Sequence, residues 1–118
     1  MKSKYGARKT NHAGHSFASR GEAGLYDYIR ALEQSREAKL KQVQPQVYLS
    51  DARILYKPDF LIEDLKLGQD VWLEFKGFET PEWRIKRRLW MFYGPGLLRV
   101  FKGYGRGLSL MEELRGKE

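Results

Sequence analysis

Three charged residues, Asp59, Glu74 and Lys76, occur in a stretch that otherwise predicts buried β-strand. In this stretch, YKPDFLIEDLKLGQDVWLEFKGF at residues 56–78, the first acid lies near the start of one apolar run, and the second acid and the lysine lie near the end of the next. A carboxylate is costly to bury unless it is paired, and a second acid beside it adds repulsion. The two acids therefore either lie in solvent at a sheet edge or hold a cation together.

The spacing predicts that these three side chains meet. The runs DFLIED and DVWLEFKG are separated by a short loop that contains a glycine, which is typical of a β-hairpin. If Glu63 pairs with Asp70 in an antiparallel hairpin, the same register places Asp59 opposite Glu74. Because side chains alternate along a strand, Lys76 lies on the same face as Glu74. We therefore expect two carboxylates and one ammonium group at one end of the hairpin.

This combination favours the hydrolysis of a phosphodiester. Such a reaction needs a cation near the nucleophile and the leaving oxygen, and Mg²⁺ is usually held by only a few carboxylates together with substrate phosphate. Asp59 and Glu74 would supply the carboxylates, and the backbone carbonyl of Phe75 would add a third protein oxygen. Lys76 would orient the attacking water or neutralise the phosphate in the transition state.

The remaining elements predict an α/β fold in which a single mixed sheet is flanked by helices. Residues 1–18 are basic and lack apolar periodicity, so we expect a flexible arm before a single domain at 19–118. The expected elements are a helix from Ser19 to about residue 39, strands at 46–50 and 52–56 that form one bent strand or a short hairpin, a helix from Thr80-Pro81 through PEWRIKRRLWMF, a strand at 97–101, and a final helix at SLMEELRG.

The charge of the chain points to a polyanionic partner. The sequence has 22 Lys and Arg against 15 Asp and Glu, a net charge of +7. By default a basic helix face is simply solvated. The cluster of basic residues after residue 83, however, begins a few residues beyond Lys76, so we expect these side chains to lie along a DNA backbone. The residues predicted to bind DNA are Lys2, Lys4, Arg8, Lys9, Arg20, Arg84, Arg87 and Arg88.

Other classes of site have little support in the sequence. The absence of cysteine excludes disulfides and thiolate metal sites. His12 and His15 lie in the basic arm without partners, and no serine has the base needed for nucleophilic catalysis. The chain has no apolar run of membrane-spanning length and no signal-peptide pattern, so we expect a soluble cytoplasmic protein without a membrane partner.

Pro58-Asp59 followed by Glu74-Phe75-Lys76 on the second strand of a hairpin resembles the PD-(D/E)XK nuclease superfamily. A preceding helix with Glu22, and the run EFKG before a basic helix, narrow the resemblance to phage-encoded, archaeal-type Holliday-junction resolving enzymes. The resemblance covers residues 16–101. It implies a restriction-endonuclease-like core with a central sheet of four or five strands.

The resemblance also implies roles for single residues. Asp59 and Glu74 match the metal carboxylates, Lys76 the catalytic lysine, and Glu22 the helix-one glutamate that adds to the metal site. The sequence also favours another role for Glu22, because Ser19 and Glu22 form a capping box in which the glutamate binds the Ser19 backbone. The implied cofactor is Mg²⁺, with Mn²⁺ able to substitute, and the implied protein is a homodimer that acts on branched DNA in the host cytoplasm.

Three functions remain open from the sequence. The first is a structure-selective endonuclease that resolves Holliday junctions. The second is a nuclease of the same superfamily that acts on duplex, nicked or mismatched DNA. The third is a non-catalytic DNA-binding module whose acids are structural, although a protein that only binds phosphate gains nothing from two carboxylates facing its ligand.

Overall fold

A five-stranded mixed sheet forms the centre of the computed structural model, which describes residues 10–12, 15–17 and 19–117. The strands, in their order across the sheet, are β3 (Ala38–Val43), β6 (Phe60–Asp64), β7 (Gln69–Phe75), β8 (Leu97–Lys102) and β9 (Ser109–Arg115). The pair β7 and β8 is parallel, and the other neighbouring strands are antiparallel. The predicted α/β fold with a mixed sheet flanked by helices is confirmed.

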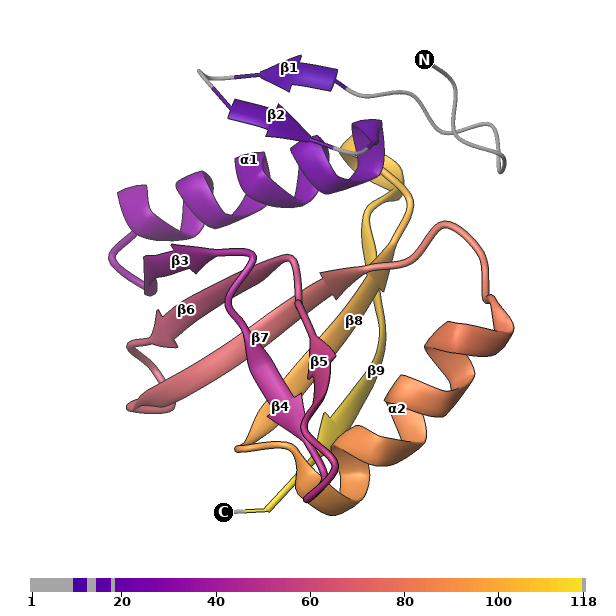
Figure 1. The fold of residues 1–118 in the computed structure, drawn as a ribbon. Helices are drawn as coiled ribbons and strands as arrows, with labels where there is room; N and C mark the ends of the chain where they lie inside the picture. The colour runs from indigo at the N-terminus through magenta and orange to yellow at the C-terminus, as the bar shows by residue number, and fades with distance from the viewer. Residues whose placement is uncertain (1–9, 13–14, 18, 118) are drawn as a thin grey trace.

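Helices cover both faces of this sheet (Figure 1). The further elements are α1 (Arg20–Gln34), α2 (Pro81–Tyr93), the hairpin of β4 (Val47–Leu49) and β5 (Ile54–Tyr56), the hairpin of β1 (Thr10–His12) and β2 (His15–Phe17), and the 3₁₀ helix η1 (Gly105–Gly107) between β8 and β9. Val71 and Leu73 of β7 pack in the core that includes α1, whereas Trp72 packs in the core that includes α2. Because β7 is the middle strand and has a core on each side, a charged side chain near its end is enclosed.

The hairpin of β6 and β7 has the predicted register. Glu63 pairs with Asp70, and Phe60 pairs with Leu73 at the far end of the ladder. The same register continued by one residue brings Asp59, which directly precedes β6, level with Glu74. The segment 46–56 also forms a hairpin, β4 and β5, which is one of the two arrangements predicted for it.

Helix α1 is shorter than predicted. It begins after Ser19, whose side chain accepts a hydrogen bond of 3.1 Å from the backbone N–H of Glu22. It ends at Gln34 rather than near residue 39, because Arg36 adopts a positive φ of 62°, a conformation that commonly closes helices. The next residues form β3, a strand that the sequence interpretation missed. Most of its exposed side chains are polar, as is common at a sheet edge.

The predicted C-terminal helix is wrong, because residues 109–115 form β9. This strand pairs with β8 from Ser109 to Arg115, and it buries Leu114 against the α2 side of the sheet. The sequence LMEEL contains good helix formers, but strand propensity depends strongly on neighbouring strands. The open edge of β8 supplies the backbone hydrogen bonds that hold residues 109–115 as a strand. The local sequence does not reveal that this edge is present.

The segment predicted as a flexible arm contains structure where it is described. β1 and β2 form a small antiparallel hairpin beside α1, and Phe17 is buried against Tyr26 and Phe60. Phe17 thus attaches the end of the segment to the core. Four predicted DNA contacts, Lys2, Lys4, Arg8 and Lys9, lie outside the described residues.

Gly21 sets the distance between α1 and the end of β7. A Cβ atom at this position would overlap the ring of Phe75. We expect Gly21→Ala to destabilise the fold by about 1–3 kcal/mol, as overpacked cores do. Gly24→Ala is the matched control, because its Cβ would meet Tyr104 at an ordinary 3.4 Å and alanine favours a helix. Urea unfolding measures both, and equal effects of the two changes would contradict this role of Gly21.

Candidate active site

The predicted acid pair is present where β6 begins and β7 ends. The backbone N–H of Phe75 donates a hydrogen bond of 2.6 Å to Oδ2 of Asp59. The charge of Glu74 is near enough to raise the pKa of Asp59. The two acids are therefore close enough to share a cation.

Glu74 is held by two further groups. The hydroxyl of Tyr56 donates a hydrogen bond of 2.6 Å to Oε1 of Glu74, and Nζ of Lys76 lies 3.4 Å from Oε2. The ring of Tyr56 packs against Trp83 and Trp90, which fixes the position of its hydroxyl. Sequence reasoning missed Tyr56, because nothing in the sequence indicates that the β5 side chain reaches the end of β7.

Burial shifts the pKa values of the acid pair upward. Loss of hydration raises the pKa of Asp59 well above its usual range, and the nearby charges of Glu74 and Glu22 raise it further. Burial likewise raises the pKa of Glu74, and its contacts with Lys76, Tyr56 and Asp59 offset only part of this effect. Such strongly perturbed carboxyl groups are characteristic of functional sites.

Glu22 approaches the same site from α1. It lies in the first turn of the helix and is only 5% exposed. In the part of the chain that the structure describes, Glu22 and Glu74 are the two charged residues that are fully buried. Glu22 is near enough to raise the pKa of Asp59. The N-terminus of α1, where backbone N–H groups point outward, favours the negative charge of Glu22. The hydrogen bond from the backbone N–H of Glu22 to the side chain of Ser19 is one half of the predicted capping box.

Lys76 lies between the acids and the protein surface. Its Nζ is 4.9 Å from the centre of the Trp83 ring, and about a third of its side chain is exposed. The ammonium group is therefore oriented by Glu74 on one side and by an aromatic face on the other. This position allows it to contact both the acid pair and a molecule bound outside.

The donor groups fit a hard divalent cation. Among the described residues, no group of three or more His, Cys, Asp and Glu is arranged to hold a metal ion. Mg²⁺, however, typically takes only one or two carboxylates and completes its shell with water and phosphate. Asp59 and Glu74 meet this requirement, and a cation would relieve their repulsion. The predicted carbonyl ligand belongs to Phe75, the residue whose N–H binds Asp59.

A basic groove of about 760 Å³ extends from Lys76. It lies between the loop after β7, helix α2 and the strands β8 and β9. Three of the predicted DNA contacts line it, Arg84, Arg87 and Arg88. Arg87, however, binds Glu112 of β9 through two hydrogen bonds of 2.6 Å, so it is held by the protein itself. Arg20 lies apart from this groove, exposed at the start of α1.

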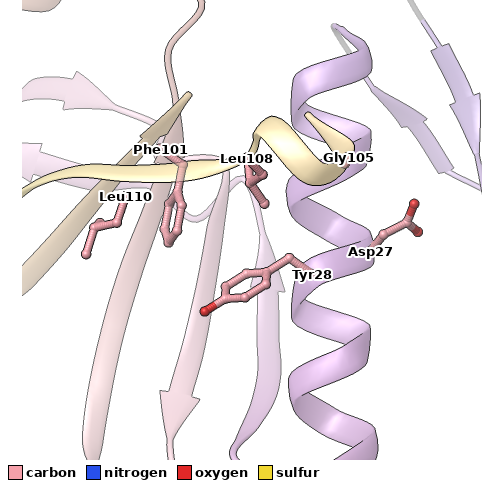
Figure 2. Close-up of a pocket in the computed structure, with 7 residues that line it drawn as sticks. Asp27, Tyr28, Phe101, Gly105, Leu108 and Leu110 are labelled. Atoms are coloured by element: carbon pink, nitrogen blue, oxygen red, sulfur yellow. The ribbon is translucent and has the colours of Figure 1, made fainter. Parts of the chain in front are cut away.

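A second hollow, of about 430 Å³, lies on the α1 side of the sheet (Figure 2). Tyr28, Phe101 and Leu110 line it, and the rings of Tyr28 and Phe101 are 5.7 Å apart. Its carboxylate, Asp27, points away from these apolar side chains (Figure 2). The hollow therefore lacks the combination of acids and lysine that marks the first site.

Fold and site together define a small α/β protein with an acid pair and a lysine at the place where strand β6 begins and the middle strand β7 ends. The chain belongs to the DUF1064 family, described as a protein of unknown function, whose family model matches residues 2–101. No curated protein and no solved structure gives a significant match to the chain. Neither helix in the described part of the chain is long and apolar enough to cross a membrane.

Removal of the Tyr56 hydroxyl tests its hold on Glu74. Tyr56→Phe leaves a buried carboxylate oxygen without its donor, which typically costs about 1–3 kcal/mol. The pKa of Glu74 should rise further, because the lost bond lowers it. Urea unfolding in chelator at neutral pH measures the loss. Tyr48→Phe on the same hairpin is the control, since Tyr48 is exposed. A Tyr56→Phe protein as stable as the control would contradict the role of this bond.

The raised pKa values predict how stability depends on pH. In the metal-free protein the acid pair binds protons up to a higher pH than the same groups do in the unfolded chain, because burial raises the pKa of both acids. Stability should therefore fall as the pH rises through the raised pKa, and Mg²⁺ should restore it. We expect the increase in Tm caused by Mg²⁺ to grow between about pH 5 and pH 8. The double variant Asp59→Asn/Glu74→Gln should lose this trend, and an equal Mg²⁺ effect at both pH values would contradict it.

Proposed function

We propose that this protein is a Mg²⁺-dependent endodeoxyribonuclease of the PD-(D/E)XK type. The observation that carries the proposal is the convergence of Asp59, Glu74 and Lys76, because Lys76 contacts Glu74 and also lines a basic groove. Burying two repelling carboxylates lowers stability, so a purely structural role for them is unfavourable. The adjacent cationic groove favours a phosphate-rich substrate.

Asp59 and Glu74 would hold Mg²⁺, which when bound supplies Lewis acidity and a water molecule of lowered pKa. Tyr56 and the N–H of Phe75 fix one oxygen of each carboxylate. Oδ1 of Asp59 and Oε2 of Glu74, which lies beside Lys76, would be the oxygens that bind the cation. Glu22 adds negative charge to the site, which increases the attraction for a divalent cation.

Lys76 would act on the substrate. Its ammonium group lies beside the acid pair and is partly exposed toward the groove. From there it can donate a hydrogen bond to a phosphate oxygen as negative charge develops. Because Trp83 and Glu74 orient the side chain before substrate arrives, little reorganisation is needed during the reaction.

The favoured substrate is a four-way DNA junction, because the sequence resembles Holliday-junction resolving enzymes. A homodimer would place two such sites about a two-fold axis and so allow paired nicks in opposite strands. Duplex, nicked and mismatched DNA are the other substrates of this reaction class.

The test is incubation of the protein with a synthetic four-way junction and with linear, nicked and mismatched duplexes of matched sequence. We expect Mg²⁺-dependent cleavage of the junction in preference to the others, and none in chelator. Equal cleavage of junction and linear duplex would overturn the junction preference but leave the nuclease. Failure to cleave any of these DNAs with Mg²⁺ or Mn²⁺ would overturn the proposed function.

A further inference from the structure

The parallel pair of β7 and β8 brings two lysines side by side. In this ladder Phe75 pairs with Phe101, and the backbone N–H of Lys76 donates a hydrogen bond of 2.8 Å to the carbonyl of Phe101. The same register continued by one residue places Lys102, the last residue of β8, level with Lys76. Because neighbouring strands lie about 4.8 Å apart, the two lysines occupy adjacent positions of the sheet.

Both lysines lie on the face of the sheet that α2 covers. Phe75 and Phe101 pack in the core on the α1 side. Because side chains alternate along a strand, the residue after each of them is directed to the α2 side. Lys76 and Lys102 accordingly line the same basic groove. Two ammonium groups at adjacent positions repel each other unless each is neutralised by an anion.

The protein neutralises one of these two lysines. Nζ of Lys76 lies 3.4 Å from Oε2 of Glu74. Lys102 is exposed, and among the described residues it forms no ion pair. Its neighbour across the β8–β9 ladder is the neutral Ser109. A second anion beside Lys76 and Lys102 would therefore have to come from a ligand.

One arginine of the groove also lacks a carboxylate partner. Arg88 of α2 is exposed, and it forms no ion pair in the part of the chain that the structure describes. The other two arginines that line the groove are held by Glu112 and Glu79. Arg88 and Lys102 are thus the cations of the groove that remain for a ligand, and a nucleic-acid phosphate has the complementary charge.

We propose that Lys102 and Arg88 form a second phosphate-binding position beside Lys76. The inference rests on the proposed function and deepens it: Lys76 contacts the phosphate that is cleaved, whereas Lys102 and Arg88 bind a neighbouring phosphate of the same DNA. Contacts of this kind position the backbone without reading the bases. The phosphate at this position also relieves the repulsion between the two lysines.

DNA binding in chelator tests this position without cleavage. Fluorescence anisotropy would measure the affinity for a labelled four-way junction over a series of salt concentrations. We expect Lys102→Ala to weaken binding up to about fivefold, the effect of losing one exposed ion pair. It should also lower the slope of the salt dependence by about one. Arg88→Ala should lower the slope by a similar amount.

Two further variants separate a bound phosphate from a general loss of charge. Arg115→Ala removes one positive charge at the other end of β9 and should leave the affinity and the slope unchanged. Lys102→Arg keeps the charge and should retain both properties. Thermal unfolding without DNA shows whether each variant is folded, and Lys102→Ala should not lower Tm, because it removes a repulsion.

The outcomes separate this inference from the proposed function. If Lys102→Ala binds DNA with the affinity and slope of the wild type, or if Arg115→Ala has an equal effect, the second phosphate position is wrong even where the protein cleaves DNA. If Lys102→Ala shows the expected loss but the wild-type protein cleaves no DNA with Mg²⁺ or Mn²⁺, the proposed nuclease fails while the phosphate position stands.

Discussion

Asp59→Asn is expected to abolish DNA cleavage and also to raise the thermal stability of the metal-free protein. Asparagine keeps an oxygen that can accept the N–H of Phe75, and its amide can donate to Glu74. The substitution therefore removes the repulsion that raises the pKa of Asp59 but keeps the local hydrogen bonds. Loss of a metal carboxylate should lower the cleavage rate at least ~10²-fold, as for other groups that stabilise charge in a transition state.

The measurements are single-turnover cleavage of a junction and Tm in chelator, and Asp64→Asn is the matched control. Asp64 is the last residue of β6, the strand that Asp59 directly precedes, but its pKa is lowered. Burial alone would raise it, and hydrogen bonds from the Leu67 backbone and from Arg99 outweigh this effect. Asp64→Asn should therefore destabilise the fold and leave the cleavage rate of the folded protein near that of the wild type. Cleavage that survives Asp59→Asn would show that these acids are not the catalytic site.

Lys76→Met is expected to lower the cleavage rate by about 10²–10³-fold while Mg²⁺ binding persists. Methionine keeps most of the length of the side chain and its contact with Trp83, but it removes the ammonium group. Because Lys76 lowers the pKa of both acids, the variant should bind Mg²⁺ more weakly at low pH and recover as the pH rises. Single-turnover cleavage and isothermal titration with Mg²⁺ measure the two properties separately.

Lys66→Met provides the control for charge and length. Lys66 lies in the turn at the opposite end of the β6–β7 hairpin, where it pairs with Glu37 in solvent. Its replacement should leave both cleavage and Mg²⁺ binding unchanged. A Lys76→Met protein that cleaves DNA as fast as this control would remove Lys76 from the mechanism.

The parts of the fold that were predictable are those determined by neighbouring residues. The β6–β7 register follows from a short turn and alternating side chains, so the meeting of Asp59 and Glu74 could be inferred from their numbers. Helix α2 carries both of its start signals in sequence, since Thr80 caps the N–H of Trp83 and Pro81 occupies the first turn. Each of these features needs only local information.

The remainder depends on residues that are distant in the chain. β9 forms because the edge of β8 is available, although its sequence favours a helix. Tyr56 reaches Glu74 across 18 positions, and Arg87 reaches Glu112 across 25. Arg87 was predicted to contact DNA, but its partner on β9 could be identified only once that segment was placed as a strand. The burial of Glu22 likewise depends on how closely Gly21 lets α1 approach Phe75.

The position of β7 between two cores has a consequence for protein engineering. Phe75 points toward α1, and Glu74 contacts Tyr56 on the side of α2, so adjacent residues attach the acid pair to both layers. Transplanting Asp59, Glu74 and Lys76 alone into another sheet would therefore transfer the charges without the supports that orient them. A functional graft would need the first turn of α1 and the β4–β5 hairpin as well, which makes the whole three-layered unit the smallest portable form of this site.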